Sequence, residues 1–185
     1  MSELASPAQL RAAFLRWALF LVPGILALGT FSGLAAGSGA GNPWFIGLVK
    51  PALYPPPATF GIVWTILYVL MGLALALVVT ARGASGRGLA VGIFAVQLVL
   101  NLAWSPVFFA MHQIKLALGL LVLIDLAVLA TVLAFRKVRP LAAAMLLPYL
   151  GWVLFATVLN WQFMEANPDA DGMADSGAQA TVEFK

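Results

Sequence analysis

Residues 51–81 read "PALYPPPATFGIVWTILYVLMGLALALVVTA" and contain no Lys, Arg, Asp or Glu. The apolar part that follows the three consecutive prolines is long enough to cross the bilayer core, which takes about 20 residues in an α-helix. Strands of a membrane barrel would alternate apolar and polar residues with a period of two, and this stretch does not. The stretch therefore predicts a transmembrane helix near 59–81, preceded by a proline-stiffened segment.

Four further segments have the same character. Residues 17–49, 88–114 and 140–164 carry no charge, and only Asp125 interrupts 116–135. The whole chain of 185 residues is 63% hydrophobic and 9% charged, against about 25% charge in soluble domains. We therefore predict an all-α integral membrane protein, a bundle of five transmembrane helices near 13–36, 59–81, 88–110, 115–135 and 140–163.

The remaining segments divide the chain into a short amino-terminal part (1–12), the transmembrane domain (13–163) and an acidic tail (164–185). The tail holds five acidic residues and little to bury, so we expect it to be disordered. The loop 37–58 is longer than most connections without structure of their own. Because its second half is apolar and rich in proline, it should lie on the membrane surface or fold back over the helices.

Positive charges predict the orientation. Cytoplasmic loops of membrane proteins carry an excess of Lys and Arg, which places the amino terminus in the cytoplasm if the chain enters a bacterial inner membrane. The first loop and the carboxyl terminus then share the opposite face. The net charge of +3 reflects this orientation and not a nucleic-acid partner. The amino-terminal side carries seven basic residues against three opposite: Arg11, Arg16, Arg82, Arg87, Arg136, Lys137 and Arg139 against Lys50, Lys115 and Lys185.

The first apolar segment has a second interpretation. Arg11 and Arg16 precede an apolar run that ends in small residues, which is also the pattern of a cleaved signal peptide. The run 17–36 is longer than the usual signal core of about 7 to 15 residues, and its glycines suit a helix interface, so a retained helix is favoured.

Three predicted helices each present aromatic and polar side chains along one face. Because buried polar groups need partners in lipid, such faces point inward. They are typical either of aromatic belts and interhelical bridges or of a cavity for a large, flat, apolar ligand, and we favour the cavity. The faces comprise Phe60, Trp64, Tyr68 and Met71; Gln97, Asn101, Trp104 and Ser105; and Tyr149, Trp152, Ala156 and Asn160.

The other candidate functional groups in the sequence give weaker indications of a function. Asp125 lies near mid-span without a second acidic residue or histidine in the spans, so we expect it to be protonated or hydrogen-bonded to a neighbouring helix, in a structural role and not in a proton relay. His112 is the only histidine, and a haem-ligating role is the minor alternative to a solvated interface residue. There is no cysteine, no metal-ligand cluster and no catalytic motif, so no metal site and no required cofactor are predicted.

Three motifs together resemble one family: "KPALYPPPATFGIVWTILYVLMG" (50–72), "QLVLNLAWSPVFFAMHQ" (97–113) and "LLPYLGWVLFATVLNW" (146–161). They are similar to the translocator proteins, also called tryptophan-rich sensory proteins or peripheral-type benzodiazepine receptors, over about residues 17–162. The resemblance implies a five-helix bundle, often a homodimer, that binds porphyrins, sterols and benzodiazepine-site ligands in a pocket closed by the first loop. Leu53 stands where the family often has tryptophan, and the helix 5 sterol motif is altered, so tight sterol binding is not predicted.

The resemblance also implies the residues of a site. Trp64 and Trp152 match two tryptophans that the family uses in light-dependent porphyrin breakdown. We also expect Lys50, beside the start of the second helix, to attract the propionates of a porphyrin. The expected ligand-binding set is Lys50, Pro55, Phe60, Trp64, Tyr68, Asn101, Trp104, Trp152, Ala156 and Asn160.

Three functions compete for this pattern. The favoured one is a membrane binding or sensory protein for porphyrins, with protoporphyrin or haem as the ligand. The alternatives are a porphyrin-degrading enzyme that uses light and oxygen, and a transporter of tetrapyrroles or other hydrophobic small molecules. Tryptophan-lined sites suffice for binding, whereas turnover and transport need features that the sequence does not display.

Overall fold

The computed structural model describes residues 6–172, and every regular element in that part of the chain is helical. Five helical stretches there are long and apolar enough to cross a membrane, which confirms the predicted five-helix membrane fold. The fifth span consists of two helices, α6 and α7, that meet at Leu146 just before Pro148. The elements are α1 (Pro7–Ala35), α2 (Pro43–Gly47), α3 (Pro57–Val79), α4 (Arg87–Ser105), the π-helical turn η1 (Pro106–Ala110), α5 (Ile114–Val138), α6 (Pro140–Met145) and α7 (Leu147–Ala166).

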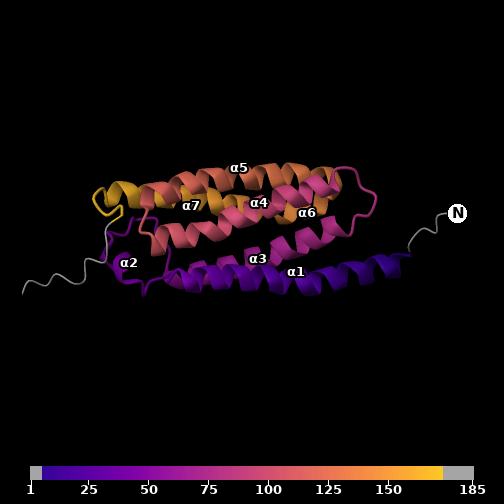
Figure 1. Ribbon diagram of the computed structural model, residues 1–185, viewed down its shortest axis with the longest axis horizontal. Coiled ribbons are helices and arrows are strands. Elements are labelled where there is room, and N and C mark those ends of the chain that lie inside the picture. Colours follow the sequence, from indigo (N-terminus) through magenta and orange to yellow (C-terminus); the bar gives the residue numbers. More distant parts are fainter. Residues whose placement is uncertain (1–5, 173–185) are drawn as a thin grey trace, which may run out of the picture.

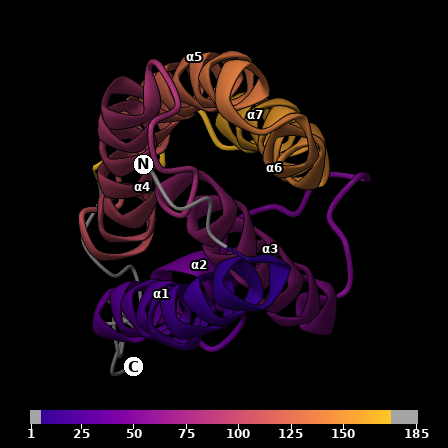
Figure 2. The same ribbon diagram turned by 90° about the vertical axis from the view of Figure 1, so that its right-hand side faces the viewer.

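The long helices run side by side along the length of the molecule (Figure 1). Seen end on, α1 and α3 lie together on one side, and α4, α5 and the pair α6/α7 form an arc on the other (Figure 2). The element α2 and the end of α7 lie at one end of the bundle, which we call the loop end. The α3–α4 connection and α6 lie at the opposite end, which we call the α6 end.

Small residues bring α1 and α3 together. A Cβ built on Gly72 of α3 would lie 2.7 Å from the Cα of Val22, so α1 approaches the backbone of α3 closely there. Farther toward the loop end, a Cβ on Gly29 would overlap the ring of Tyr68. Such contacts are the usual basis of helix association in lipid, where backbones approach over small side chains. The first apolar segment thus packs as an integral part of the bundle.

The amino-terminal end of α1 differs from the expectation. Residues 7–12, assigned to a separate segment, already belong to the helix. Ser6 accepts a hydrogen bond from the Gln9 N–H (3.3 Å), the Gln9 side chain accepts one from the Ser6 N–H (2.8 Å), and Pro7 occupies the first helical position. This capping box is a strong start signal that the charge pattern does not reveal.

The loop 37–58 folds back over the helix ends, one of the two predicted arrangements, and contains the short helix α2. Asn42 caps α2 by accepting from the Phe45 N–H (2.9 Å), and its amide also donates to the Phe109 carbonyl (3.3 Å). Trp44, Phe45 and Leu48 are buried in a cluster with side chains of η1, α5 and α7. We call residues 42–56, which include α2, the lid.

The tail prediction was wrong for its first part. α7 continues to Ala166, and residues 167–172 pack against the lid and the start of α5 through Asn167 and Asp171. These hydrogen bonds join the tail to backbone groups more than fifty positions away, which an argument from tail composition overlooks. Residues 173–185 lie outside the described residues.

Two pairs of polar side chains within the spans are hydrogen-bonded across helices. Tyr149 of α7 donates to Gln97 of α4 (2.9 Å), and Thr157 of α7 donates to the carboxylate of Asp125 on α5 (2.8 Å). The expected hydrogen bond from Asp125 to a neighbouring helix is therefore confirmed. In a medium without water these bonds satisfy groups that would otherwise be costly to bury.

Candidate ligand-binding site

A cavity of about 490 Å³ lies between the helices toward the loop end. Sites for small molecules usually measure about 300–1,000 Å³, so its size suits a ligand. α1, α3, α4, η1, α5 and α7 contribute to its wall, together with the first loop. Most of the lining is apolar or aromatic, and the polar side chains are few: Thr30, Ser38, Tyr54, Tyr68, Thr65, Asn101, Ser105 and Asn160, with the indoles of Trp64, Trp104 and Trp152.

The aromatic face of α3 forms one wall. Phe60, Trp64 and Tyr68 follow each other at intervals of four residues, which places them on one side of the helix. The rings of Trp64 and Tyr68 stack with centroids 5.2 Å apart and planes 28° apart. Met71, the last residue of this face, is fully buried in the core below the cavity.

Opposite α3, the face of α7 provides Trp152, Ala156 and Asn160. The ring of Trp152 meets that of Phe60 edge to face at 5.8 Å, so the two walls touch through aromatic rings. Ala156 is the small side chain between two larger ones along this face. Asn160 donates from its amide to the Ile114 carbonyl (3.0 Å), which ties α7 to the first turn of α5.

The α4 face contributes Asn101 and Trp104. The hydroxyl of Tyr68 donates to the amide oxygen of Asn101 (3.3 Å), which joins the α3 and α4 walls. Trp104 stacks on Phe108 of η1 at 5.1 Å. Gln97 lies on the same face of α4, four residues before Asn101. It does not line the cavity, because its side chain accepts a hydrogen bond from Tyr149 in the packed core. Each of the three predicted faces thus continues from cavity wall into packed core.

Eight of the ten expected ligand-binding residues line this cavity together, and two do not. The two outside its lining are Lys50 and Pro55. The Lys50 ammonium donates to the carbonyls of Phe45 and Leu48, the latter at 2.8 Å, and lies 4.3 Å from the centroid of the Phe45 ring. Partial burial lowers the pKa of the Lys50 side chain below its ordinary value. Lys50 therefore caps the carboxyl end of α2, where a cation is favourable, and does not line the cavity.

Sequence reasoning missed the cavity residues outside the three faces. α1 contributes Leu26, Gly29 and Thr30 to the wall. Phe45 and Tyr54 come from the lid, and their rings pack together at 5.7 Å. The small residues of α1 were recognised as a packing signal, and they also open space for a ligand. Lid residues follow no helical period, so no pattern could assign them to the cavity.

The cavity offers aromatic surfaces and a few hydrogen-bonding groups. Among residues 6–172, no three His, Cys, Asp or Glu side chains form a cluster that could hold a metal ion. The ring of the single histidine, His112, stacks on Trp44 at 4.6 Å, with planes 13° apart. The arrangement suits binding of an apolar, flat molecule by stacking and burial.

The fold and the cavity define a multi-pass helical membrane protein with a ligand-sized aromatic cavity beneath a folded loop. The sequence model of the TspO/MBR family matches residues 20–165. The chain belongs to the TspO/MBR family.

Several characterised relatives are similar over most of their length. The human translocator protein is 42% identical over 137 residues, which cover 73% of this chain and 81% of that protein. The tryptophan-rich protein TspO of Chlorobaculum tepidum is 42% identical over 126 residues, covering 68% and 80%. The tryptophan-rich sensory protein of Cereibacter sphaeroides is 40% identical over 154 residues, covering 82% and 92%.

Proposed function

We propose that the chain binds porphyrins, with protoporphyrin or haem as the ligand, in the cavity beneath the lid. The observation that carries the proposal is the convergence of Phe60, Trp64, Trp104 and Trp152 on one apolar space of about 490 Å³. Indole and phenyl rings stack on flat conjugated molecules and bury large apolar areas. The few polar groups, such as the Tyr68–Asn101 pair, can orient a ligand without making the site hydrophilic.

Titration of the purified full-length protein in the dark tests this proposal. Protoporphyrin and haem should quench tryptophan emission in a saturable way, because three of the six tryptophans line the cavity. Ala156→Leu, whose larger side chain would extend into the cavity, serves as the matched negative variant. Quenching that does not saturate, or that is equal in parent and variant, would show nonspecific partition into the detergent or lipid.

A second candidate function rests on the placement of Trp64 and Trp152 in the cavity wall, on α3 and α7 respectively. A porphyrin excited by light in contact with an indole, with dioxygen as the oxidant, could be broken down there. Trp64→Phe and Trp152→Phe keep an aromatic face, so dark affinity should change little while loss of the porphyrin absorption band under illumination should slow. Loss of the band at the parental rate in both variants would exclude the photochemical role.

We further propose that the loop end lies opposite the cytoplasm and that the protein forms a homodimer in the lipid bilayer. The orientation is supported by the basic residues of the α3–α4 and α5–α6 connections, which share one end of the bundle with the start of α1. A dimer is supported by Gly88 and Gly92 on α4, where an added Cβ would meet nothing within 4 Å. Labelling of single cysteines from either side of the membrane tests the first proposal, and cross-linking tests the second.

A further inference from the structure

The six residues after α7 run back across the lid. Asn167, which is buried, forms hydrogen bonds to the backbone of a single lid residue with both the oxygen and the nitrogen of its side-chain amide. Its oxygen accepts from the Val49 N–H (2.7 Å), and its nitrogen donates to the Val49 carbonyl (3.0 Å). The same nitrogen also donates to the Phe163 carbonyl (2.9 Å), so the side chain is anchored on α7 while it holds the lid.

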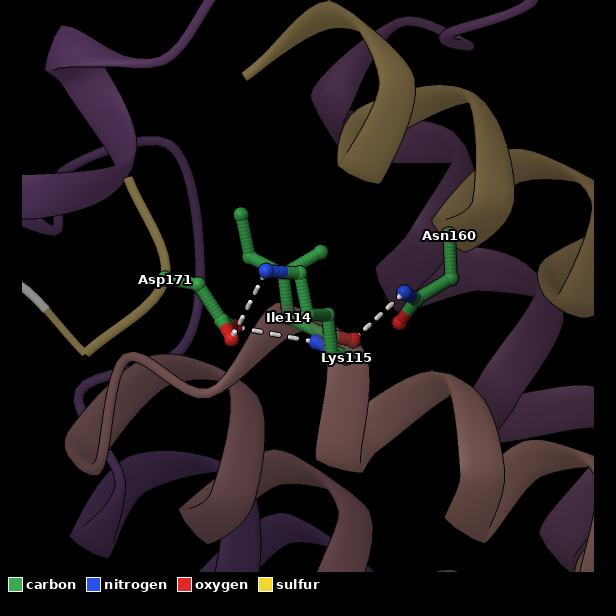
Figure 3. Close-up of polar contacts among 4 residues, drawn as sticks. All are labelled: Ile114, Lys115, Asn160 and Asp171. Atoms are coloured by element: carbon green, nitrogen blue, oxygen red, sulfur yellow. Dashed lines mark hydrogen bonds and ion pairs between the residues drawn. The ribbon is translucent and has the colours of Figure 1, made fainter. Parts of the chain in front are cut away.

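The end of this segment is fixed to the start of α5. The Asp171 carboxylate accepts from the Lys115 N–H (3.0 Å) and lies 3.8 Å from the Lys115 ammonium. Gly172 donates from its N–H to the His112 carbonyl (2.8 Å). Figure 3 shows Asp171 on one side of this first turn and Asn160, a cavity residue, on the other, where it bonds the Ile114 carbonyl. The tail segment and the cavity wall therefore hold the same turn.

The point that Asn167 holds is next to the anchors of the lid. Val49 directly follows Leu48, and Leu48, Trp44 and Phe45 are each less than 10% exposed. Phe45 also lines the cavity. Release of Val49 would remove two of the hydrogen bonds that hold the segment joining α2 to α3, to which Tyr54 of the cavity lining belongs. Segments held by few contacts open locally at much lower free energy than the whole fold.

We propose that residues 167–172 are a latch that holds the lid closed and sets the rate at which a ligand enters and leaves the cavity. The ligand part of this inference rests on the proposed porphyrin binding, whereas the latch itself does not. The matched family region ends at residue 165, so the latch lies beyond it. The latch depends on an amide that donates and accepts at once, which few side chains can do.

The chain contains no cysteine, so a single introduced thiol reports on the lid. Leu48→Cys places that thiol at a buried lid position. In the full-length protein in liposomes, its modification by a soluble maleimide should be slow. Adding Asn167→Asp, which keeps the acceptor for Val49 but turns an oxygen toward the carbonyls of Val49 and Phe163, should raise the rate about tenfold.

A charge-matched pair of variants provides the control. Asp171→Asn removes the charge that faces Lys115 and should raise the modification rate more modestly, by about threefold. Asp169→Asn removes the same charge from an exposed neighbour and should leave the rate unchanged. Thermal denaturation checks that all variants are folded. Equal modification rates in the parent, Asn167→Asp and Asp171→Asn would then overturn the latch.

Protoporphyrin then serves as the probe of exchange. In the dark, Asn167→Asp should speed both association and dissociation measured by tryptophan quenching, because the lid opens more often. Unchanged exchange rates despite faster thiol modification would overturn the claim that the latch controls entry. If the parent itself binds no protoporphyrin, the proposed function fails, while the modification rates still decide whether the latch exists.

Discussion

The two ends of the bundle differ in the side chains at which their helices meet, and the aromatic cavity lies toward the loop end. At the α6 end, α3, α4 and α6 bury several small side chains almost completely, beside the stacked ring pair of Phe94 and Phe135; these small residues are Ala74, Ala76, Ala90, Ala142 and Ala143. At the loop end, α3, α4 and α7 instead surround the cavity with large rings such as those of Trp64, Trp104 and Trp152. Small side chains let helices close on each other, whereas rings hold them apart and leave space that no neighbour fills.

The comparison assigns different tasks to the two ends. The α6 end supplies close packing, which in lipid must come from van der Waals contact because lipid tails provide no hydrophobic drive between helices. The loop end retains a space for a ligand, and the aromatic contacts around it keep the walls in place. Substitutions at the α6 end should therefore act on stability, and substitutions at the loop end should act on binding.

The largest effect is expected from Gly72→Ala. The added Cβ would lie 2.7 Å from the Cα of Val22, so the helices α1 and α3 must separate. Overpacking against backbone costs up to about 3 kcal/mol, and we expect a loss of about 2 kcal/mol in the free energy of unfolding. The measurement is reversible unfolding in mixed detergent with the parent as reference.

Gly29→Ala is the matched change nearer the loop end. Its Cβ would meet the ring of Tyr68, a side chain that can turn into the neighbouring cavity. It should therefore cost less stability than Gly72→Ala and should weaken ligand binding more. The reverse order of the two effects would contradict the division of tasks between the two ends.

Ala156→Leu is expected to have the next largest effect. Its larger side chain would extend into the cavity from α7, so it should weaken dark binding of protoporphyrin at least about tenfold, or about 1.4 kcal/mol, with little change in the melting temperature. Val158→Leu, at a position on the same helix that is 45% exposed, is the control and should bind as the parent does. If Ala156→Leu bound protoporphyrin normally, the ligand would occupy another site.

The division between the ends also explains what the sequence could predict. Five spans follow from charge-free runs, because a charge inside lipid is costly wherever it falls along a helix. The start of α1 at Pro7 and the break at Leu146 depend on local capping and on Pro148, which a hydropathy argument does not register. The course of residues 167–172 depends on hydrogen bonds to residues more than fifty positions away, beyond any local pattern.

The residues of the site also divide into those that the sequence could predict and those that it could not. Trp64, Trp104 and Trp152 could be predicted because helical spacing places aromatic and polar residues on one face of each helix. Lys50 lies outside the cavity lining because its ammonium caps α2, a helix of five residues that periodicity did not predict. Periodicity identifies walls made of long helices, but it does not say which residues of the expected loop cover face the cavity; Phe45 and Tyr54 were assigned only from their packing.

Lys50→Ala sharpens the comparison with a smaller effect. Loss of a cation at a helix carboxyl end costs about 0.3–1 kcal/mol, so the variant should loosen α2 and weaken protoporphyrin binding about threefold. Because the Lys50 ammonium caps α2 instead of lining the cavity, the substitution should lower the affinity for protoporphyrin dimethyl ester as much as the affinity for protoporphyrin, the free acid. A loss confined to the free acid would instead show that Lys50 contacts the propionates.

The smallest effect is expected from Asp125→Asn, midway between the two ends. Asp125 joins α5 to α7 by accepting from the Thr157 hydroxyl (2.8 Å), and it is not part of the cavity lining. An asparagine oxygen can accept the same hydrogen bond, and interhelical bonds of this kind in membranes contribute on average about 0.6 kcal/mol. The variant should therefore change the free energy of unfolding by less than about 0.6 kcal/mol and leave dark protoporphyrin binding intact, whereas Thr157→Val, which removes the donor, should destabilise the bundle more.

The measurements are thermal unfolding in detergent and protoporphyrin titration on the same samples. Lost binding in an Asp125→Asn variant that melts at the parental temperature would give Asp125 a functional role, and the separation between packing and binding would then fail at the middle of the molecule.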